Sequence, residues 1–147
     1  MAKILVIHGP NLNLLGQREK EVYGEVTLDK INQNLTHLAE KYNIEIICVQ
    51  SNSEGEIIDI LHQVGVGSDC VIMNPAAYTH YSIAIRDAVK GINTPIIEVH
   101  LSNIYSREEF RHKSVIAPVA VGQISGFGHF GYQMAFFAAL NIINTQK

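Results

Sequence analysis

The chain has 147 residues, a length typical of one domain around a single hydrophobic core, so we expect residues 1–147 to form one domain. Its formal net charge is −3 and no run of Lys and Arg forms a basic stripe, which excludes a nucleic-acid partner from the candidates. Hydrophobic residues make up 47% and charged residues 17%, an apolar balance for so short a chain that suggests buried contacts between subunits.

Targeting and redox signals favour the cytoplasm. The N-terminal run MAKILVIHGPN has one lysine and a short, interrupted apolar stretch, so we interpret it as a strand and not as a signal peptide. No segment approaches the roughly 20 apolar residues of a membrane span, so no membrane partner is expected. Cys48 and Cys70 lie in apolar runs without CxxC spacing, which favours buried, reduced thiols.

Five continuous apolar runs predict β-strands. None shows the alternation of a half-exposed strand, so each suits a parallel sheet that is covered on both faces. The runs are Ile4 to Ile7, Ile44 to Val49, Cys70 to Met73, Ile96 to Val99 and Val119 to Ile124.

Helical periodicity fills the segments between these runs. The clearest case is 27–42, where leucines and an isoleucine recur on one stripe. Thr27 and Thr79 are candidate N-caps, and Gly65 and Gly91 are candidates for the left-handed residue after a helix. Further helices are predicted at 54–64, 79–90, 107–112 and 129–143.

Strict alternation of strand and helix predicts a doubly wound α/β fold. The best match is a flavodoxin-like three-layer sandwich with a five-stranded parallel sheet in the order 2-1-3-4-5. In such a sheet, ligands bind beyond the carboxyl ends of the strands. Polar clusters follow three strands, at His8 to Asn11, Asn74 to His80 and Glu98 to Asn103. We therefore expect a site at this edge.

The first strand–helix connection is too long to be a simple connector. It runs from Gly9 to about Gly24, whereas such loops usually have two to six residues. Within it, Arg18 precedes Tyr23 by five residues, and a nearby guanidinium favours the phenolate. An isolated Tyr of this kind would more often be an amphipathic anchor, but the converging polar clusters favour a general base.

Strand 4 supplies a second candidate pair. Glu98 and His100 are two apart on a strand and so share a face, where a carboxylate can orient an imidazole. His100 is a candidate general acid, although a lone strand histidine is more often a hydrogen-bonded core residue. A metal site of His80, Glu98 and His100 is a weaker alternative, because no HExxH or comparable spacing supports it.

The segment 126–131, GFGHFG, fits the GxGxxG pattern of dinucleotide sites. We reject that interpretation, because the motif needs a following strand with an acidic residue about 20 positions later and the chain has no room for one. Close approach of a helix to the sheet explains these glycines better.

Five ordered blocks resemble type II 3-dehydroquinate dehydratase over essentially the whole chain. They are HGPNLNLLGQREKEVYG, QSNSEGEIID, NPAAYTHYSIAIRDA, EVHLSNIYSREEFRHKS and GQISGFGHFGY. The resemblance implies a lyase of the shikimate pathway that dehydrates 3-dehydroquinate in trans to 3-dehydroshikimate, through an enolate, with no metal or organic cofactor.

The resemblance also implies roles for individual residues. Tyr23 would remove the C2 proton, Arg18 would hold Tyr23 as phenolate, and Asn11 would position a water at the enolate oxygen. His100, oriented by Glu98, would protonate the departing C1 hydroxyl. Substrate binding would fall to the hydroxyl partners Asn74, His80 and Arg111, the carboxylate partners Leu101 and Ser102, the lid residue Arg107, and Asp87, which would reach a neighbouring subunit's site.

A dodecamer, a tetramer of trimers, is implied as the assembly. Lys20, Ala76, Tyr81 and Tyr105 depart from the family's usual proline, glycine, threonine and histidine, and Lys20 is expected to make the lid less rigid. Two other functions are left as alternatives: a metal-assisted hydrolase, and a non-enzymatic flavodoxin-like module that binds a polyol or a nucleotide.

Overall fold

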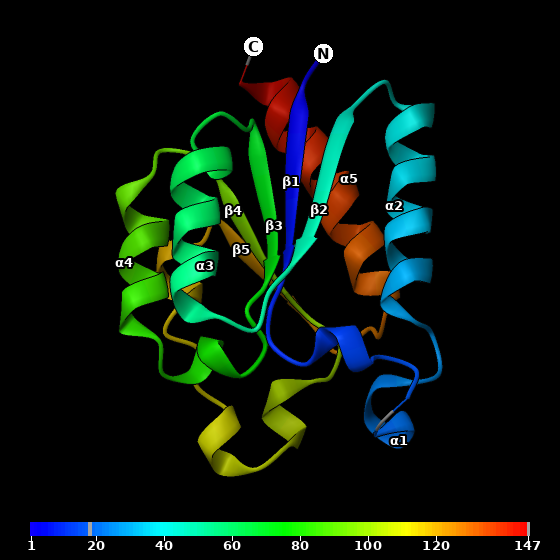
Figure 1. Cartoon of the computed structure of the whole chain (residues 1–147), viewed down its shortest axis with the longest axis vertical. Coiled ribbons are helices and arrows are strands. Elements are labelled where there is room, and N and C mark those ends of the chain that lie inside the picture. The colour runs from blue at the N-terminus through cyan, green and yellow to red at the C-terminus, as the bar shows by residue number, and fades with distance from the viewer. Residues whose placement is uncertain (18, 147) are drawn as a thin grey trace.

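A five-stranded parallel sheet forms the middle of the molecule in the computed structural model, which describes residues 1–17 and 19–146 and, for Lys20 and Tyr23, the backbone alone (Figure 1). The strands lie in the order β2-β1-β3-β4-β5 and their pairings are parallel. This confirms the predicted fold class and strand order. The strands are β1 (Lys3–His8), β2 (Glu45–Gln50), β3 (Cys70–Asn74), β4 (Ile96–His100) and β5 (Gly122–Ser125).

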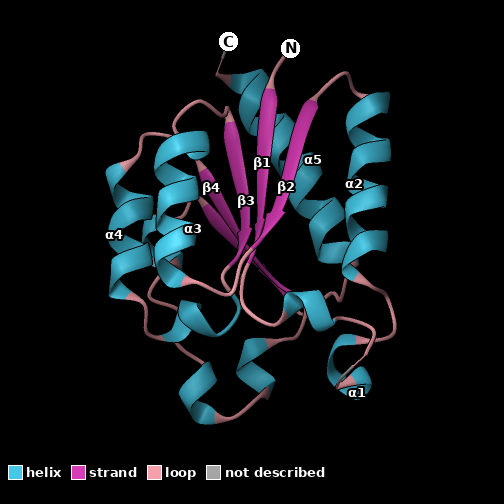
Figure 2. Cartoon of the chain, viewed as in Figure 1, coloured by secondary structure: helices cyan, strands magenta, loops and turns pink. Residues whose placement is uncertain are grey.

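Helices cover both faces of the sheet, which gives three layers (Figure 2). On one face lie α2 (Leu28–Lys41) and α5 (Phe130–Thr145), and on the other lie α3 (Glu54–Ile60) and α4 (Ile83–Gly91) (Figure 1). The short α1 (Lys20–Tyr23) lies beyond the carboxyl edge of the strands. The chain also forms a π-helical turn, η2 (Leu61–Gly65), and the 3-10 turns η1 (Leu12–Leu14), η3 (Ala76–His80), η4 (Ile104–Ser106), η5 (Glu109–Arg111) and η6 (Ala117–Val119).

Two hydrophobic cores lie on either side of the sheet. Because successive side chains of a strand point to opposite faces, alternate residues of β1 divide between the cores. Ile4 and Val6 pack with α2 and α5, whereas Leu5 and Ile7 pack with α3 and α4. This explains why the apolar runs of the inner strands show no alternation.

Helix α2 illustrates how local sequence sets an element. The Thr27 hydroxyl accepts a hydrogen bond from the Lys30 N–H at 3.2 Å, which confirms the predicted N-cap. Ile31, Leu35 and Ala39 are buried along its inner stripe. The helix ends at Lys41, and two residues later Asn43 turns the chain with a left-handed φ of 57°, a conformation that asparagine tolerates better than most residues.

Other predicted helix boundaries are wrong. The cap of α4 is Ser82, which accepts from the Ile85 N–H at 3.0 Å, while Thr79 belongs to η3 and binds elsewhere. Gly65 and Gly91 lie inside η2 and α4 and are not left-handed. The predicted helix 107–112 is reduced to η5, so Arg107 does not share a helix face with Arg111.

Of the glycines in the rejected dinucleotide motif, Gly131 has the packing role that we predicted, whereas a Cβ on Gly128 would meet nothing within 4 Å. A Cβ on Gly131 would lie 3.5 Å from Val99 Cγ1 and 3.6 Å from Ile124 Cγ2, so this first turn of α5 rests directly on the sheet. Gly126 has φ of 99° and lies against Asn103, which brings β5 back toward the segment that follows β4.

Successive side chains of a strand point to opposite faces of the sheet, and this also decides the face to which each polar residue at the carboxyl edge points. His8 and Asn74 are paired across β1 and β3 and point toward the α2 and α5 face. Glu98 and His100 point to the opposite face, where α4 and the segment after η5 cover them.

Among the residues the structure describes, no helix is both long and apolar enough to cross a membrane.

The buried stripe of α2 yields a stability test. Leu35 is fully buried and the adjacent Thr36 is exposed. We expect Leu35→Ala to lower the free energy of unfolding by about 2–5 kcal/mol, because a buried cavity replaces the side chain. Thr36→Ala is the matched control and should change it by less than about 0.5 kcal/mol. Urea unfolding measures both, and equal effects would contradict the assigned helix face.

Candidate active site

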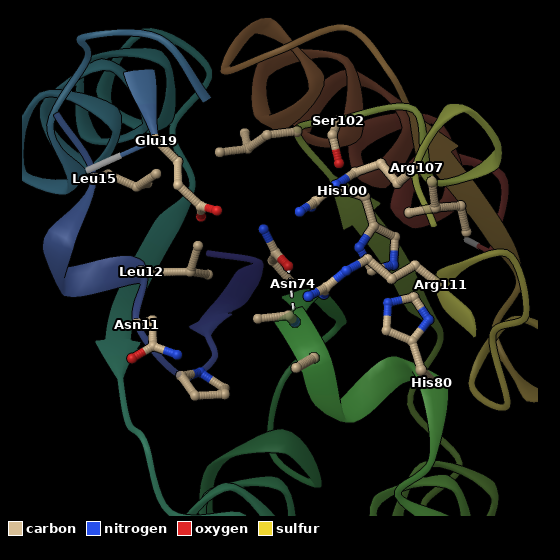
Figure 3. A pocket seen from close by; sticks show the side chains of 15 residues that line it. Asn11, Leu12, Leu15, Glu19, Asn74, His80, His100, Ser102, Arg107 and Arg111 are labelled. Atoms are coloured by element: carbon tan, nitrogen blue, oxygen red, sulfur yellow. Dashed lines mark hydrogen bonds between the residues drawn. The ribbon is translucent and has the colours of Figure 1, made fainter. Parts of the chain in front are cut away.

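A cavity of about 140 Å³ opens at the carboxyl edge of the sheet (Figure 3). Segments that follow β1, β3 and β4 form its walls, so the cavity lies at the edge of the sheet where we predicted a site. In Figure 3, Leu12, Leu15 and Glu19 face Ser102, Arg107 and Arg111 across the cavity. The lining residues are Pro10, Asn11, Leu12, Leu15, Glu19, Asn74, Ala76, Ala77, His80, His100, Leu101, Ser102, Ile104, Arg107 and Arg111.

Close approach of β1 and β3 forms the floor of this cavity. The Gly9 N–H donates to the Asn74 carbonyl at 2.8 Å. A Cβ on Gly9 would lie 2.7 Å from the backbone of Pro75, closer than real Cβ contacts, so only glycine fits here. The chain then turns through Asn11, which is left-handed with φ of 68° and donates its N–H to Asn52 Oδ1 at 3.0 Å.

Glu98 and His100 form a buried pair behind the cavity. Glu98 is fully buried, His100 is 5% exposed, and His100 Nε2 lies 2.5 Å from Glu98 Oε2. A carboxylate can only accept, so Nε2–H is the donor and the imidazole ring is fixed. The other ring nitrogen of His100 is the one available to a bound ligand.

Two hydroxyl groups complete the surroundings of Glu98. Thr79 donates a short hydrogen bond to Glu98 Oε2, and Ser114 donates to the same oxygen at 2.8 Å. The N–H groups of Ile116 and Ala117 donate to Ser114 Oγ at 3.1 and 2.9 Å, so its hydroxyl proton is directed to Glu98. Burial raises the Glu98 pKa, but the interactions with His100, Thr79 and Ser114 lower it by a larger amount. The net pKa therefore lies below its ordinary value.

His80 stands beside His100 with its ring stacked at 6.4 Å between centroids. Its Nδ1 lies 2.8 Å from the Lys113 carbonyl, which can only accept, so Nδ1 carries the proton. Burial lowers the His80 pKa, and the charges of His100 and Arg111 act in the same direction. Neutral His80 therefore offers Nε2 as a hydrogen-bond acceptor.

Asn74 occupies the centre of the cavity floor (Figure 3). Its Oδ1 accepts the Ala76 N–H at 3.0 Å, and its side chain also hydrogen bonds to the Tyr132 hydroxyl. Ala76 itself is left-handed, with φ of 52°. The Asn74 amide oxygen is thus engaged by the backbone, which leaves the amide N–H groups as its donors.

Arginines supply the positive charge of the cavity. Arg107 and Arg111 both line it, and Arg111 Nε lies 3.2 Å from Glu108 Oε1. Glu108 also lies 3.8 Å from Arg107 Nε, so one exposed carboxylate is shared by the two guanidinium groups. Two cations at one wall suit a ligand that carries a carboxylate.

Most predicted site residues lie together, and the remainder divides into two groups. Asn11, Asn74, His80, His100, Leu101, Ser102, Arg107 and Arg111 line the cavity, with Glu98 directly behind His100. Arg18 and the Tyr23 side chain lie outside the described part of the chain, whose backbone places Tyr23 in α1. Asp87 is exposed on α4 and does not line the cavity.

Several residues of the site were not predicted from the sequence. Thr79 had been assigned to a helix cap, and Ser114 stood at the end of the fourth block without an assigned role, yet both bind Glu98. Leu12, Leu15 and Ile104 lie within the quoted blocks but had no assigned role, and they form apolar walls of the cavity. Glu19 gives the cavity a carboxylate (Figure 3), and its position between Arg18 and Lys20 was the available signal.

The metal-site alternative gains no support from the geometry. Within residues 1–17 and 19–146, no three His, Cys, Asp or Glu side chains are grouped so that they could hold a metal ion. The Glu98 oxygens are instead occupied by hydroxyl and imidazole donors.

Comparisons with known proteins agree with one another. A family model described as dehydroquinase class II matches residues 2–140. A 3-dehydroquinate dehydratase of Pelotomaculum thermopropionicum is 60% identical over 143 residues, 97% of this chain and 99% of that protein. A type II dehydroquinase crystal structure from Butyrivibrio crossotus has a TM-score of 0.92 at 49% identity, covering 95% of this chain and 97% of its own. One from Propionibacterium acnes has a TM-score of 0.90 at 40% identity, covering 95% and 97%.

A histidine beneath the cavity makes stability depend on pH. Burial lowers the pKa of His8 from 6.5 to about 4, although its hydrogen bond to Asn32 opposes the shift. Between pH 6.5 and 4 the unfolded chain therefore binds a proton that the folded chain does not. The contribution of His8 to the free energy of unfolding is therefore complete above pH 6.5. It is lost as the pH falls toward 4, by about 3 kcal/mol in all.

We expect His8→Gln to remove this dependence. The slope of the unfolding free energy against pH should then correspond to about one bound proton less between pH 4 and 6.5. His37→Gln on the exposed side of α2 is the control and should keep the wild-type slope. Urea unfolding at several pH values measures the slopes. An unchanged slope in His8→Gln would contradict a buried, neutral His8.

Proposed function

Because this chain belongs to the class II dehydroquinase family, we propose that it acts as a type II 3-dehydroquinate dehydratase, a lyase of the shikimate pathway. It removes water from 3-dehydroquinate to give 3-dehydroshikimate. The C2–H and C1–O bonds break, a C1–C2 double bond forms, and the hydroxyl leaves as water. The observation that carries the proposal is the buried Glu98–His100 pair at the wall of a polar cavity.

His100 is the general acid in this proposal. The bond from its Nε2 to Glu98 fixes the ring, so its other nitrogen delivers a proton to the departing C1 hydroxyl. The carboxylate stabilises the imidazolium that must form before each proton transfer. Thr79 and Ser114 keep Glu98 ionised, which supports this division of roles.

The base half of the reaction comes from the first long connection. Tyr23 removes the C2 proton as a phenolate, Arg18 stabilises that phenolate, and Asn11 holds a water at the enolate oxygen. An ordinary Tyr, with a pKa of about 10, is about 0.1% ionised at pH 7, so a cation beside it is a chemical requirement. The backbone of α1 beyond the cavity mouth and the position of Asn11 on the cavity wall are consistent with these roles.

Substrate recognition follows from the donors and acceptors of the remaining wall. Neutral His80, the Asn74 amide and Arg111 bind hydroxyl groups, while the Leu101 backbone and Ser102 hold the carboxylate. Arg107 belongs to the lid with Arg18 and Tyr23. The reaction as proposed uses no metal or organic cofactor, because proton transfer on each side of a ketone needs only a base and an acid.

We further propose that residues 1–147 work as one catalytic domain, in the cytoplasm, within a dodecamer built as a tetramer of trimers. Exposed apolar side chains near the β5 edge, at Val121, Phe127 and Phe130, support burial against other subunits. Asp87 lies away from its own cavity, as expected if it reaches a neighbour's site. The free thiols of Cys48 and Cys70 suit a reducing compartment.

Replacement of the proposed base tests the reaction. With 3-dehydroquinate as substrate, we expect Tyr23→Phe to lower kcat by at least about 100-fold, because general-base catalysis is lost. Ultraviolet absorbance of the conjugated enone product measures turnover. Tyr42→Phe, at the exposed C-cap tyrosine of α2, is the control and should retain activity. Wild-type protein that forms no enone would refute the function, and an active Tyr23→Phe would refute the base.

The assembly is tested by light scattering coupled to size exclusion. We expect a single species with the mass of twelve chains. Asp87→Ala should keep that mass but raise KM, because the neighbour's site loses one contact. A monomer with full activity would contradict both the assembly and the role of Asp87.

A further inference from the structure

A line of hydrogen bonds runs from the surface of α2 to the floor of the cavity. His8 Nε2 lies 2.8 Å from Asn32 Oδ1, and His8 Nδ1 lies 2.9 Å from the Tyr132 hydroxyl. The Tyr132 hydroxyl in turn hydrogen bonds to Asn74, which lines the cavity. The four side chains come from α2, β1, α5 and β3, so segments up to 124 residues apart meet here.

The donor and the acceptor of each hydrogen bond in this series can be assigned in only one consistent way. Asn32 Oδ1 can only accept, so neutral His8 carries its proton on Nε2 and its Nδ1 accepts. The Tyr132 O–H must then donate to Nδ1, which leaves its oxygen lone pairs to accept an N–H from Asn74. Burial raises the pKa of the Tyr132 phenol, so it stays protonated as this order requires.

Asn74 is therefore held at both ends of its amide. Its Oδ1 accepts the Ala76 N–H at 3.0 Å, and one N–H donates to Tyr132. A reversed amide would face the Ala76 N–H with a donor and lose that bond. The second amide N–H is the group that remains for a ligand in the cavity.

We propose that Tyr132, aligned by His8 and Asn32, is a positioning residue that fixes Asn74 as a hydrogen-bond donor to an oxygen of the bound substrate. The inference rests on the proposed dehydratase function. Tyr132 is 1% exposed and does not line the cavity, so it acts on the substrate only through Asn74. Register supports this connection, because His8 and Asn74 are direct partners across β1 and β3.

A double-mutant cycle separates positioning from general stabilisation. Tyr132→Phe removes only the hydroxyl and keeps the ring that packs beside His8 at 5.1 Å between centroids. In the wild-type background we expect kcat/KM for 3-dehydroquinate to fall about 5- to 50-fold. In an Asn74→Ala background the same change should alter kcat/KM by less than 2-fold, since Tyr132 no longer has an amide to hold. Its effect on Tm should persist in both backgrounds.

Asn32→Ala provides a second route to the same result. Asn32 is half-buried on α2, and its loss releases the His8 tautomer without touching the core. We expect a smaller decrease in kcat/KM, about 2- to 5-fold, which also disappears in the Asn74→Ala background. This variant keeps the proposal testable even if Tyr132→Phe does not fold.

The outcomes distinguish this proposal from the proposed function. If wild-type protein forms no enone, the function fails before the cycle begins. If wild-type and Asn74→Ala turn over substrate and Tyr132→Phe costs the same factor in both backgrounds, Tyr132 does not act through Asn74 and the proposal is overturned. Wild-type kcat/KM in both Tyr132→Phe and Asn32→Ala would overturn it equally.

Discussion

A carboxylate that is removed from water needs compensating hydrogen bonds, and Glu98 sets this requirement for the whole site. It is fully buried, so burial alone would favour its neutral form. Three donors offset this cost: the Thr79 hydroxyl, the Ser114 hydroxyl and the His100 imidazole. They come from three separate segments of the chain, so this set of donors and the oriented imidazole exist only in the folded structure.

The sheet uses its two faces for different parts of the site. Glu98 and His100 face the α4 side, where they form the proposed proton-donating group, and Asn74 faces the α5 side, where Tyr132 holds it. Both groups reach the same cavity because parallel strands present their carboxyl ends at one edge. The close contact of Gly9 with Pro75 brings the ends of β1 and β3 together at the floor between them.

Features with a local physical cause could be predicted from the sequence. Strand order followed from alternating apolar runs and helical periods, and the site's edge followed from polar residues at strand ends. Side-chain partners over long separations could not be predicted in this way. A threonine hydroxyl suits a helix cap and a buried carboxylate equally well, and only the fold placed Thr79 beside Glu98. The contacts of Tyr132 with His8 and Asn74 likewise depend on how α5 packs.

Glu98 is proposed to hold His100 for proton transfer, and the substitution Glu98→Gln removes its charge alone. The amide keeps the size of the side chain but cannot stabilise the imidazolium as a carboxylate does. Steady-state turnover of 3-dehydroquinate by this variant, checked for folding by circular dichroism, is the measurement. We expect kcat to fall by about 100-fold, a typical contribution of general acid catalysis, while KM stays within about 2-fold. Wild-type kcat in a folded Glu98→Gln variant would contradict it.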